Sequence, residues 1–307
     1  MSKKYDAILM IGYGAPEKIE DIRPFLQNVA KGRPIPPDRL EEVAHHYELF
    51  GGKSPLNEYT YRQAIGLQNK LADYGHDLPV DVGMRNWHPF TPDTIKKIYD
   101  NGARKVIGMI MAAHQSDASW ERYQRDVQEA LTELGLEMEF DYSPPLFDHP
   151  LFIENSADRV QDCLNQIPNE EYPETMILFT AHSIPVPMAE ASPYVQQLET
   201  TARLIAEKLN YDNWRLVYQS RSGRPTDPWL EPDVCDVIEE ISKDGVKNVI
   251  AQPIGFICDH IEVLFDIGVE AQETSDEVGI KLYRAKTVND DPKFIEAMAD
   301  VVLKMME

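Results

Sequence analysis

Short apolar runs alternate with helical stretches along this chain, and this alternation constrains the fold more than any other feature. The runs DAILMI at 6–11, MILF at 176–179 and VIAQPIGFI at 249–257 have the composition of buried β-strands. Segments with helical periodicity lie between such runs. This order is typical of a parallel sheet covered by helices. The sequence therefore predicts an α/β protein.

Two passages in the second half of the chain echo passages in the first. IYDNGARKVIGMIMAAHQS resembles ISKDGVKNVIAQPIGFICD, with Gly102 and Gly245 each ending a helix, and DAILMIGYG resembles TMILFTAHS at 175–183. These echoes indicate two similar βα-rich halves, although chance similarity between Gly-terminated helices would give the same pattern. We expect the break in QIPNEEYPE, near 165–174. The final helix, within 291–307, is expected to pack back on the first half.

Composition excludes several classes of partner. The 307 residues carry 52 acidic and 30 basic side chains, a formal charge of −22, which opposes binding to nucleic acid and to anionic lipid. No run approaches the ~20 apolar residues of a membrane span, so we expect no stable membrane anchor. The three cysteines, Cys163, Cys235 and Cys258, are widely separated, which fits a reducing cytoplasm.

Two stretches carry most of the chemistry. In TMILFTAHSIP, His182 ends an apolar run. The second stretch, PIGFICDHIEVLFDIGVE, contains five polar or charged residues of interest: Asp259, His260, Glu262, Asp266 and Glu270. The last three are spaced i, i+4, i+8, so on a helix they share one face and could pass a cation or protons along it. Both stretches follow β-type runs, and ligands bind at the carboxyl ends of parallel strands.

Each of these features also has an ordinary structural interpretation. An acidic row on a helix is usually a solvated outer face. A single His at the end of a buried strand is more often hydrogen-bonded within the structure than catalytic. His260 could orient the cluster through its ring N–H or satisfy backbone groups, and we favour this structural role. The placement of His182 and the carboxylates after apolar runs favours metal handling coupled to proton removal.

Several motifs in the same order resemble those of one family, the ferrochelatases, from Asp6 to the last helix. They are LFTAHSIP followed by SPY at 192–194, GGKSPL, YQSRSG, DPWLEPDV and DHIEVLFD. Ser192 stands where most members have Gly, a change at a turn. The resemblance implies insertion of Fe2+ into a porphyrin. It also implies two Rossmann-like domains, at 1–170 and 171–290, with the macrocycle in the cleft between them.

The resemblance also implies roles for particular residues. His182 faces the porphyrin centre with Glu262 beside it, and both are the expected catalytic residues and Fe2+ ligands. Asp266 and Glu270 are further candidate ligands, and Asp259 and His260 are expected to lie behind these groups. Tyr13 matches a position whose phenol oxygen approaches the iron from the opposite face.

The porphyrin periphery has its own expected contacts. Ser54 and Tyr123 match family positions that touch the macrocycle, and His46 with Tyr47 replaces the Arg-Tyr pair of some relatives. Ala30 stands where some relatives place an Arg for a propionate. Either Lys31 or Arg33 would have to take over that contact.

Coproporphyrin III is the expected substrate. Tyr13 and the YQSRSG and DPWLEPD passages resemble the bacterial branch that uses this tetrapropionate ring. The net charge of −22 would repel a tetra-anion, so local cations must outweigh the global field over a Debye length of ~8 Å. Four cations cluster in sequence around the expected mouth of the cleft: Lys31, Arg33, Arg39 and Lys53.

Other interpretations remain open at this point. Protoporphyrin IX is the alternative substrate. A cobalt or nickel chelatase acting on a sirohydrochlorin-type ring, or a haem carrier without chelatase activity, would resemble parts of the pattern. Three scattered cysteines are too few for the four thiolates of a 2Fe–2S cluster, so we expect none. The expected partners are the porphyrin, Fe2+ and, transiently, other enzymes of haem biosynthesis.

Overall fold

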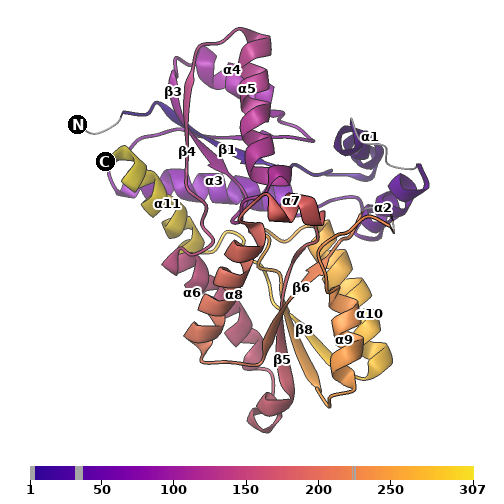
Figure 1. The fold of residues 1–307 in the computed structure, drawn as a ribbon. Helices are drawn as coiled ribbons and strands as arrows, with labels where there is room; N and C mark the ends of the chain where they lie inside the picture. Colours follow the sequence, from indigo (N-terminus) through magenta and orange to yellow (C-terminus); the bar gives the residue numbers. More distant parts are fainter. Residues whose placement is uncertain (1–3, 32–36, 223, 225) are drawn as a thin grey trace. The chain divides into compact units, whose positions relative to one another are not determined.

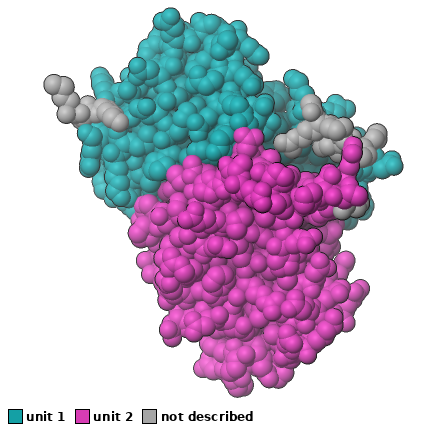
Figure 2. Space-filling model, viewed as in Figure 1, with its two compact units in different colours: residues 1–111, 119–144, 295–307 teal, residues 112–118, 145–294 magenta. Residues whose placement is uncertain are grey.

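The computed structural model describes residues 4–31, 37–222, 224 and 226–307. Within these residues the chain forms two four-stranded sheets, all of whose paired strands run parallel, with helices around them (Figure 1). The chain divides into two compact units (Figure 2). Unit 1 comprises residues 1–111, 119–144 and 295–307, and unit 2 comprises residues 112–118 and 145–294. The α/β class expected from the sequence is confirmed.

Unit 1 is built on a sheet with the strand order β2-β1-β3-β4. Its strands are β1 (Ala7–Gly12), β2 (Val80–Met84), β3 (Lys105–Ile110) and β4 (Glu139–Tyr142). The helices of this part of the chain are α1 (Ile19–Ala30), α2 (Pro37–Leu49), α3 (Leu56–Asp73), α4 (Thr91–Asp100), the π-helix η1 (Asp117–Glu121), α5 (Arg122–Leu134) and, at the end of the chain, α11 (Pro292–Met306).

Unit 2 is built on a sheet with the order β6-β5-β7-β8. Its strands are β5 (Thr175–His182), β6 (Trp214–Gln219), β7 (Asn248–Gln252) and β8 (Lys281–Arg284). Its helices are α6 (Pro150–Leu164), the 3-10 turn η2 (Asn169–Glu174), α7 (Val186–Glu190), α8 (Tyr194–Leu209), α9 (Val234–Ser242), the π-helix η3 (Val263–Glu270) and α10 (Ala271–Val278).

The two sheets repeat one topology. In each sheet the first strand in sequence lies second in the order, with the next strand on one side of it and the third on the other. The echo between DAILMIGYG and TMILFTAHS thus corresponds to β1 and β5. In the other echo, the helix ends at Gly102 and Gly245 come shortly before β3 and β7. In open parallel sheets, ligands bind at the carboxyl edge, at the point where the chain switches sides of the sheet.

Both central strands are almost wholly buried, which explains why their sequences are continuously apolar rather than alternating. Every residue of β1 is buried, and so are the first seven residues of β5. Leu178 and Val249 contribute to a core that α9 and α10 complete through Ile238 and Ala271. Such doubly covered strands leave only their ends open to a ligand.

Two sequence expectations need correction. The break between halves was expected near 165–174, but α6 packs on α8 and β7, so residues 145–164 belong to unit 2. The apolar run VIAQPIGFI was expected to be a strand, but β7 ends at Gln252. Pro253 follows, and proline has no N–H to continue a sheet ladder.

Residues 295–307 belong to unit 1, the half on which the last helix was expected to pack. Glu296 accepts hydrogen bonds from Lys70 Nζ (2.9 Å) and Tyr74 Oη (2.5 Å) of the α3 region. Ile295 lies against Gly66, where an added Cβ atom would come within 2.9 Å of Ile295 Cδ1.

In the described part of the chain, no helix combines the length and apolar composition needed to span a lipid bilayer.

The GGKSPL motif forms a tight approach to the start of α1. Gly51 and Gly52 both have positive φ, 72° and 77°. A Cβ atom on Gly52 would lie 2.5 Å from Ile19 N and 2.6 Å from Ile19 Cα, whereas one on Gly51 would meet nothing within 4 Å. Ser54 then donates its backbone N–H to Pro16 O at 3.1 Å, which ties the motif to the loop after β1.

Replacement of these two glycines separates the conformational effect from the packing effect. Gly51→Ala should cost only the left-handed conformation, ~1–2 kcal/mol of unfolding free energy. Gly52→Ala should cost a further ~1–3 kcal/mol because the backbone of Ile19 cannot move aside easily. Urea unfolding of both variants measures this difference. Equal unfolding midpoints would contradict the predicted close approach.

Candidate active site at the carboxyl edge of the second sheet

His182 is the last residue of β5, between β6 and β7. The strand register places it opposite Gln219, the last residue of β6. The next residue, Ser183, donates its backbone N–H to Gln219 O at 2.8 Å. On the other side, Gly255 lies so close that a Cβ atom would come within 2.7 Å of Ala181 Cβ. The strand end that carries the imidazole is therefore held from both sides.

The imidazole of His182 has a defined proton position. Its Nδ1 lies 2.5 Å from the backbone oxygen of Ser183. Because a carbonyl oxygen can only accept a hydrogen bond, we assign the proton of the neutral ring to Nδ1. Nε2 of the neutral ring therefore carries a lone pair, which can take a proton or bind a metal ion.

Glu262 lies next to this nitrogen. Its Oε2 is 3.8 Å from His182 Nε2, and the two side chains are 37% and 31% exposed. Glu262 immediately precedes η3, in the segment that follows β7. The structure thus brings together the two residues expected to be catalytic. Both remain open to an incoming ligand.

The helix that carries the acidic row differs from the ordinary α-helix that the row's spacing suggested. Residues 263–270 form a π-helix, and α10 continues from it as an α-helix. π-helical hydrogen bonds close over five residues, so side chains four apart are separated by slightly less than one turn. The three carboxylates still follow one another along the helix. Short π-helical segments are frequent at functional sites.

Asp266, in the middle of this row, is buried, with an exposed fraction of 8%. Its Oδ2 accepts hydrogen bonds from Ser220 Oγ and from Gln219 Nε2, the latter at 3.3 Å. Thr180 Oγ1 in turn donates to Gln219 Oε1 at 2.7 Å. This bond directs the amide N–H of Gln219 toward Asp266. Three strand-end side chains are thus connected to the π-helix.

The pKa of Asp266 is raised to about 7, mainly by burial and also by the charges of Glu262 and Glu270, against the hydrogen bonds from Ser220 and Gln219. Near neutral pH the carboxyl is therefore present in both protonation states. Glu270 is exposed. The interpretation of the row as a solvated face is wrong for Asp266.

Sequence reasoning did not single out Gln219 or Ser220 individually, although YQSRSG was noted as a motif. Ser220 has a φ of 63°, in the left-handed region that non-glycine residues rarely adopt. Such conformations cost ~1–3 kcal/mol and cluster at functional sites. The detectable signal was a polar Gln-Ser pair directly after the apolar run of β6.

Asp259 and His260 precede Glu262 in the sequence, and each contacts other residues of unit 2. Asp259 is buried and accepts hydrogen bonds from Arg284 Nη1 (3.1 Å), Asn289 Nδ2 (3.1 Å) and Thr287 N (3.3 Å). His260 packs edge-on against Phe256, with ring centroids 4.4 Å apart. Burial lowers the pKa of His260, and the charges of Glu262 and Asp259 oppose this effect. At neutral pH His260 is therefore uncharged.

Unit 1 contains an aromatic cluster at the equivalent edge of its own sheet. Tyr13 directly follows β1, and its backbone oxygen accepts from Asn86 N at 2.9 Å. Phe25 makes T-shaped contacts with Tyr13, Tyr47 and Trp87, at centroid distances of 6.2, 5.7 and 6.4 Å. The structure thus joins Tyr13 and Tyr47 through Phe25. Sequence reasoning missed Phe25 and Trp87.

The other expected substrate contacts of unit 1 are spread over several elements. Ser54 is buried at 1% exposure, Tyr123 is buried on α5, and His46 is partly exposed on α2. Lys31 is exposed at the end of α1, and Arg33 lies outside the described residues.

Two of the four cations expected near the substrate already have partners. Arg39 pairs with Glu42 at 2.6 Å, and Lys53 pairs with Glu58 at 3.2 Å. Their charges are therefore partly neutralised. Lys31 is then the described cation expected to attract the propionates of the substrate.

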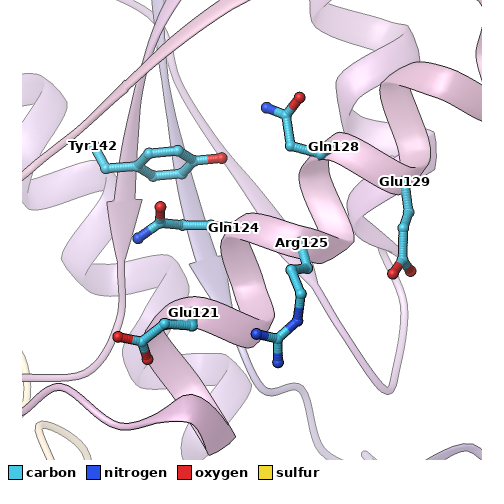
Figure 3. A pocket seen from close by; sticks show the side chains of 6 residues that line it. All are labelled: Glu121, Gln124, Arg125, Gln128, Glu129 and Tyr142. Carbon is cyan, nitrogen blue, oxygen red and sulfur yellow. The ribbon is translucent and has the colours of Figure 1, made fainter. Parts of the chain in front are cut away.

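One surface hollow lies on unit 1. Its volume is about 420 Å³, and it is lined by η1, α5 and β4 (Figure 3) through Glu121, Gln124, Arg125, Gln128, Glu129 and Tyr142. None of these matches an expected site residue. In the described residues, moreover, no group of three or more His, Cys, Asp or Glu side chains is arranged to hold a metal ion.

Comparison with solved structures places the fold among the chelatases. SirB from Bacillus subtilis matches with a TM-score of 0.60 at 11% identity, over 99% of this chain and 96% of that chain. CbiX, described as the terminal enzyme of sirohaem biosynthesis in denitrifying bacteria, matches with a TM-score of 0.56 at 10% identity, over 98% of this chain and all of that chain. At such identities the likeness concerns the fold alone.

Sequence relatives give a closer assignment. The coproporphyrin III ferrochelatases of Streptomyces coelicolor and Mycolicibacterium smegmatis are each 41% identical over 98% of this chain, covering 85% and 90% of those proteins. A ferrochelatase of Rhodopirellula baltica is 38% identical over 97% of this chain and 85% of that protein. The Ferrochelatase family model matches residues 5–306. The chain therefore belongs to the ferrochelatase family.

Proposed function

We propose that this protein inserts Fe2+ into a porphyrin ring, with coproporphyrin III as its substrate and iron coproporphyrin as its product in haem biosynthesis. Membership of the ferrochelatase family supports the reaction class. The single structural observation that carries the proposal is the pairing of His182 Nε2 with Glu262 Oε2 at 3.8 Å. It joins a neutral base that has an available lone pair to a carboxylate that can hold a hard cation.

Metallation releases two protons from the ring, because two pyrrole N–H groups must lose them as the iron binds. An imidazole can take and release protons near neutral pH, since its unperturbed pKa is ~6.5. We assign the proton-accepting role to His182 Nε2. Removing protons before or during iron entry lets the pyrrole nitrogens bind the cation without a build-up of positive charge.

The carboxylates take the complementary role. Oxygen ligands suit a hydrated Fe2+ on its way in, whereas nitrogen ligands suit its final place in the ring. Glu262 lies beside His182, so it can hand the cation over or receive protons. Asp266, with a pKa of about 7, can exchange protons near neutral pH. The exposed Glu270 provides an exit to solvent.

The choice of coproporphyrin III rests on the relatives and on charge. Several relatives near 40% identity are named coproporphyrin III ferrochelatases. Their ring carries four propionates, two more than protoporphyrin IX. The exposed ammonium of Lys31 is the described cation best suited to meet one of them at short range. Contact of Tyr13 with the iron stays a prediction.

A haem carrier is the alternative from another class. Tyr13 alone would serve such a protein as an axial ligand. It would have no use for a buried Asp266 that titrates near neutral pH, connected to strand ends by Gln219 and Ser220. We also infer that the reaction takes place in the cytoplasm, because the three cysteines are widely separated in the sequence and odd in number, as is usual in a reducing compartment.

Removal of the base should abolish most turnover. His182→Ala is expected to lower the rate of anaerobic Fe2+ insertion by at least ~10²- to 10⁴-fold, the contribution typical of general acid–base catalysis, with the fold retained. The rate is followed by the change from the porphyrin to the metalloporphyrin spectrum. His76→Ala serves as the control, since His76 lies in unit 1 and has no role in the proposed site. Wild-type turnover by His182→Ala would refute the assignment.

Substrate preference tests the second half of the proposal. The kcat/KM for coproporphyrin III should exceed that for protoporphyrin IX in the same detergent-containing buffer. Lys31→Glu should raise KM for coproporphyrin III, and the increase should shrink as salt is added, because exposed charges are screened. Lys304→Glu, at the far end of the sequence on α11, is the matched charge reversal. A higher kcat/KM for protoporphyrin IX would refute the substrate assignment.

A further inference from the structure

The peptide that joins His182 to Ser183 is held at both of its polar groups. Its carbonyl oxygen, which belongs to His182, accepts a hydrogen bond from Tyr194 Oη at 3.1 Å. Its N–H, which belongs to Ser183, donates to Gln219 O at 2.8 Å. Tyr194 is the first residue of α8 and is 6% exposed. Two different elements therefore bond to this peptide, α8 through Tyr194 and β6 through Gln219.

The orientation of this peptide determines the tautomer of the imidazole. The peptide is planar, so its two hydrogen bonds fix one plane, and the two backbone torsions of Ser183 then set where that residue projects its own carbonyl. That next carbonyl, Ser183 O, is the acceptor for His182 Nδ1. The side chain of Ser183 adds a further restraint, because its Oγ donates to Leu230 O at 2.8 Å. Rotation of the peptide would remove the acceptor from Nδ1.

Tyr194 is itself supported by buried groups. Its ring meets His114 edge-on, with centroids 6.4 Å apart and planes at 87°. His114 Nε2 lies 2.9 Å from Thr201 Oγ1, and that hydroxyl donates to Phe147 O at 2.7 Å. The hydroxyl has one hydrogen, so His114 Nε2 must be the donor to it. Gln197, on the same helix, is joined to Gln115 by two hydrogen bonds of 2.8 and 2.7 Å.

Both titratable groups in this support keep one charge state near neutral pH. Burial lowers the pKa of His114 to about 3, so this imidazole stays neutral. Burial also raises the pKa of the Tyr194 phenol, so the hydroxyl keeps its proton. The donor to His182 O is therefore present near neutral pH.

We propose that Tyr194 is a positioning residue for the reaction: by donating to the carbonyl of His182 it holds Ser183 O against Nδ1 and so keeps the lone pair of the neutral ring on Nε2, facing Glu262. Its importance for turnover rests on the proposed function, whereas its effect on the tautomer does not. The SPY motif, which sequence comparison left without a role, thereby acquires one.

The test compares two tyrosines that bond to opposite ends of the same strand. Tyr194→Phe removes the donor to His182 O. Tyr211→Phe removes a donor to Thr175 O, at the first residue of β5, where the hydrogen bond is 2.9 Å long. Both variants lose one phenol hydroxyl that donates to β5. Nitrogen-15 NMR of the labelled imidazoles reports which nitrogen of His182 carries the proton, and kcat and KM are measured alongside.

We expect the unaltered protein and Tyr211→Phe to show His182 protonated on Nδ1 when neutral. Tyr194→Phe should show a population protonated on Nε2, with kcat lowered by ~10- to 100-fold, as is usual when a partner that orients a ligating or basic His is removed. KM for the porphyrin should stay the same. Tyr194→4-aminophenylalanine, which keeps an N–H donor at this point, should restore the original tautomer.

An unchanged tautomer in Tyr194→Phe, or equal shifts in both Phe variants, would overturn the proposal. If Tyr194→Phe does not fold, 4-fluorophenylalanine at the same position fills the space without donating, and the same two outcomes apply to it. An unaltered protein that fails to metallate any porphyrin would refute the proposed function instead. The NMR comparison would still decide the role of Tyr194.

Discussion

The hydrogen bond from His182 Nδ1 to the carbonyl of Ser183 is the interaction on which the chemistry of unit 2 depends. It decides which ring nitrogen carries the proton, and therefore whether a lone pair faces Glu262. The acceptor is a backbone atom of the residue that follows β5, and hydrogen bonds from Ser183 to Gln219 O and Leu230 O hold that residue in place. A base made in this way needs no separate carboxylate to orient it. The nearby acids can then serve the cation and the protons.

The two sheets share one topology but present different chemistry at their carboxyl edges. After β1 the chain presents a phenol, Tyr13, on an aromatic support centred on Phe25. At the end of the equivalent strand β5 it presents an imidazole, with Glu262 and the buried Asp266 near it. Apolar surface suits a flat macrocycle, whereas ionisable groups suit cation and proton transfer. A repeated scaffold thus carries two specialised edges.

The α/β class and the extent of the last helix could be predicted from the sequence, because apolar runs and their polar ends are local patterns, whereas the closeness of His182 to Glu262 was expected only from the family resemblance. Other features depend on contacts between distant segments. The membership of α6 in unit 2 follows from its packing on α8 and β7, and the burial of Asp266 follows from its bonds to Gln219 and Ser220. The row's i, i+4 spacing could not distinguish a π-helix from an α-helix, since both place such residues on neighbouring faces.

The central claim is that His182 and Glu262 act as one unit, and a double-mutant cycle tests it most directly. Rates of Fe2+ insertion would be measured for His182→Ala, Glu262→Gln and the double variant, with His182→Ala and Glu239→Gln, at an exposed position on α9, as the comparison pair. Residues that act together show strongly non-additive losses. The double variant that carries His182→Ala and Glu262→Gln should therefore be about as slow as His182→Ala alone. In the comparison pair, the two fold-losses in rate should multiply. If the fold-losses of His182→Ala and Glu262→Gln also multiplied in their double variant, the account would be contradicted.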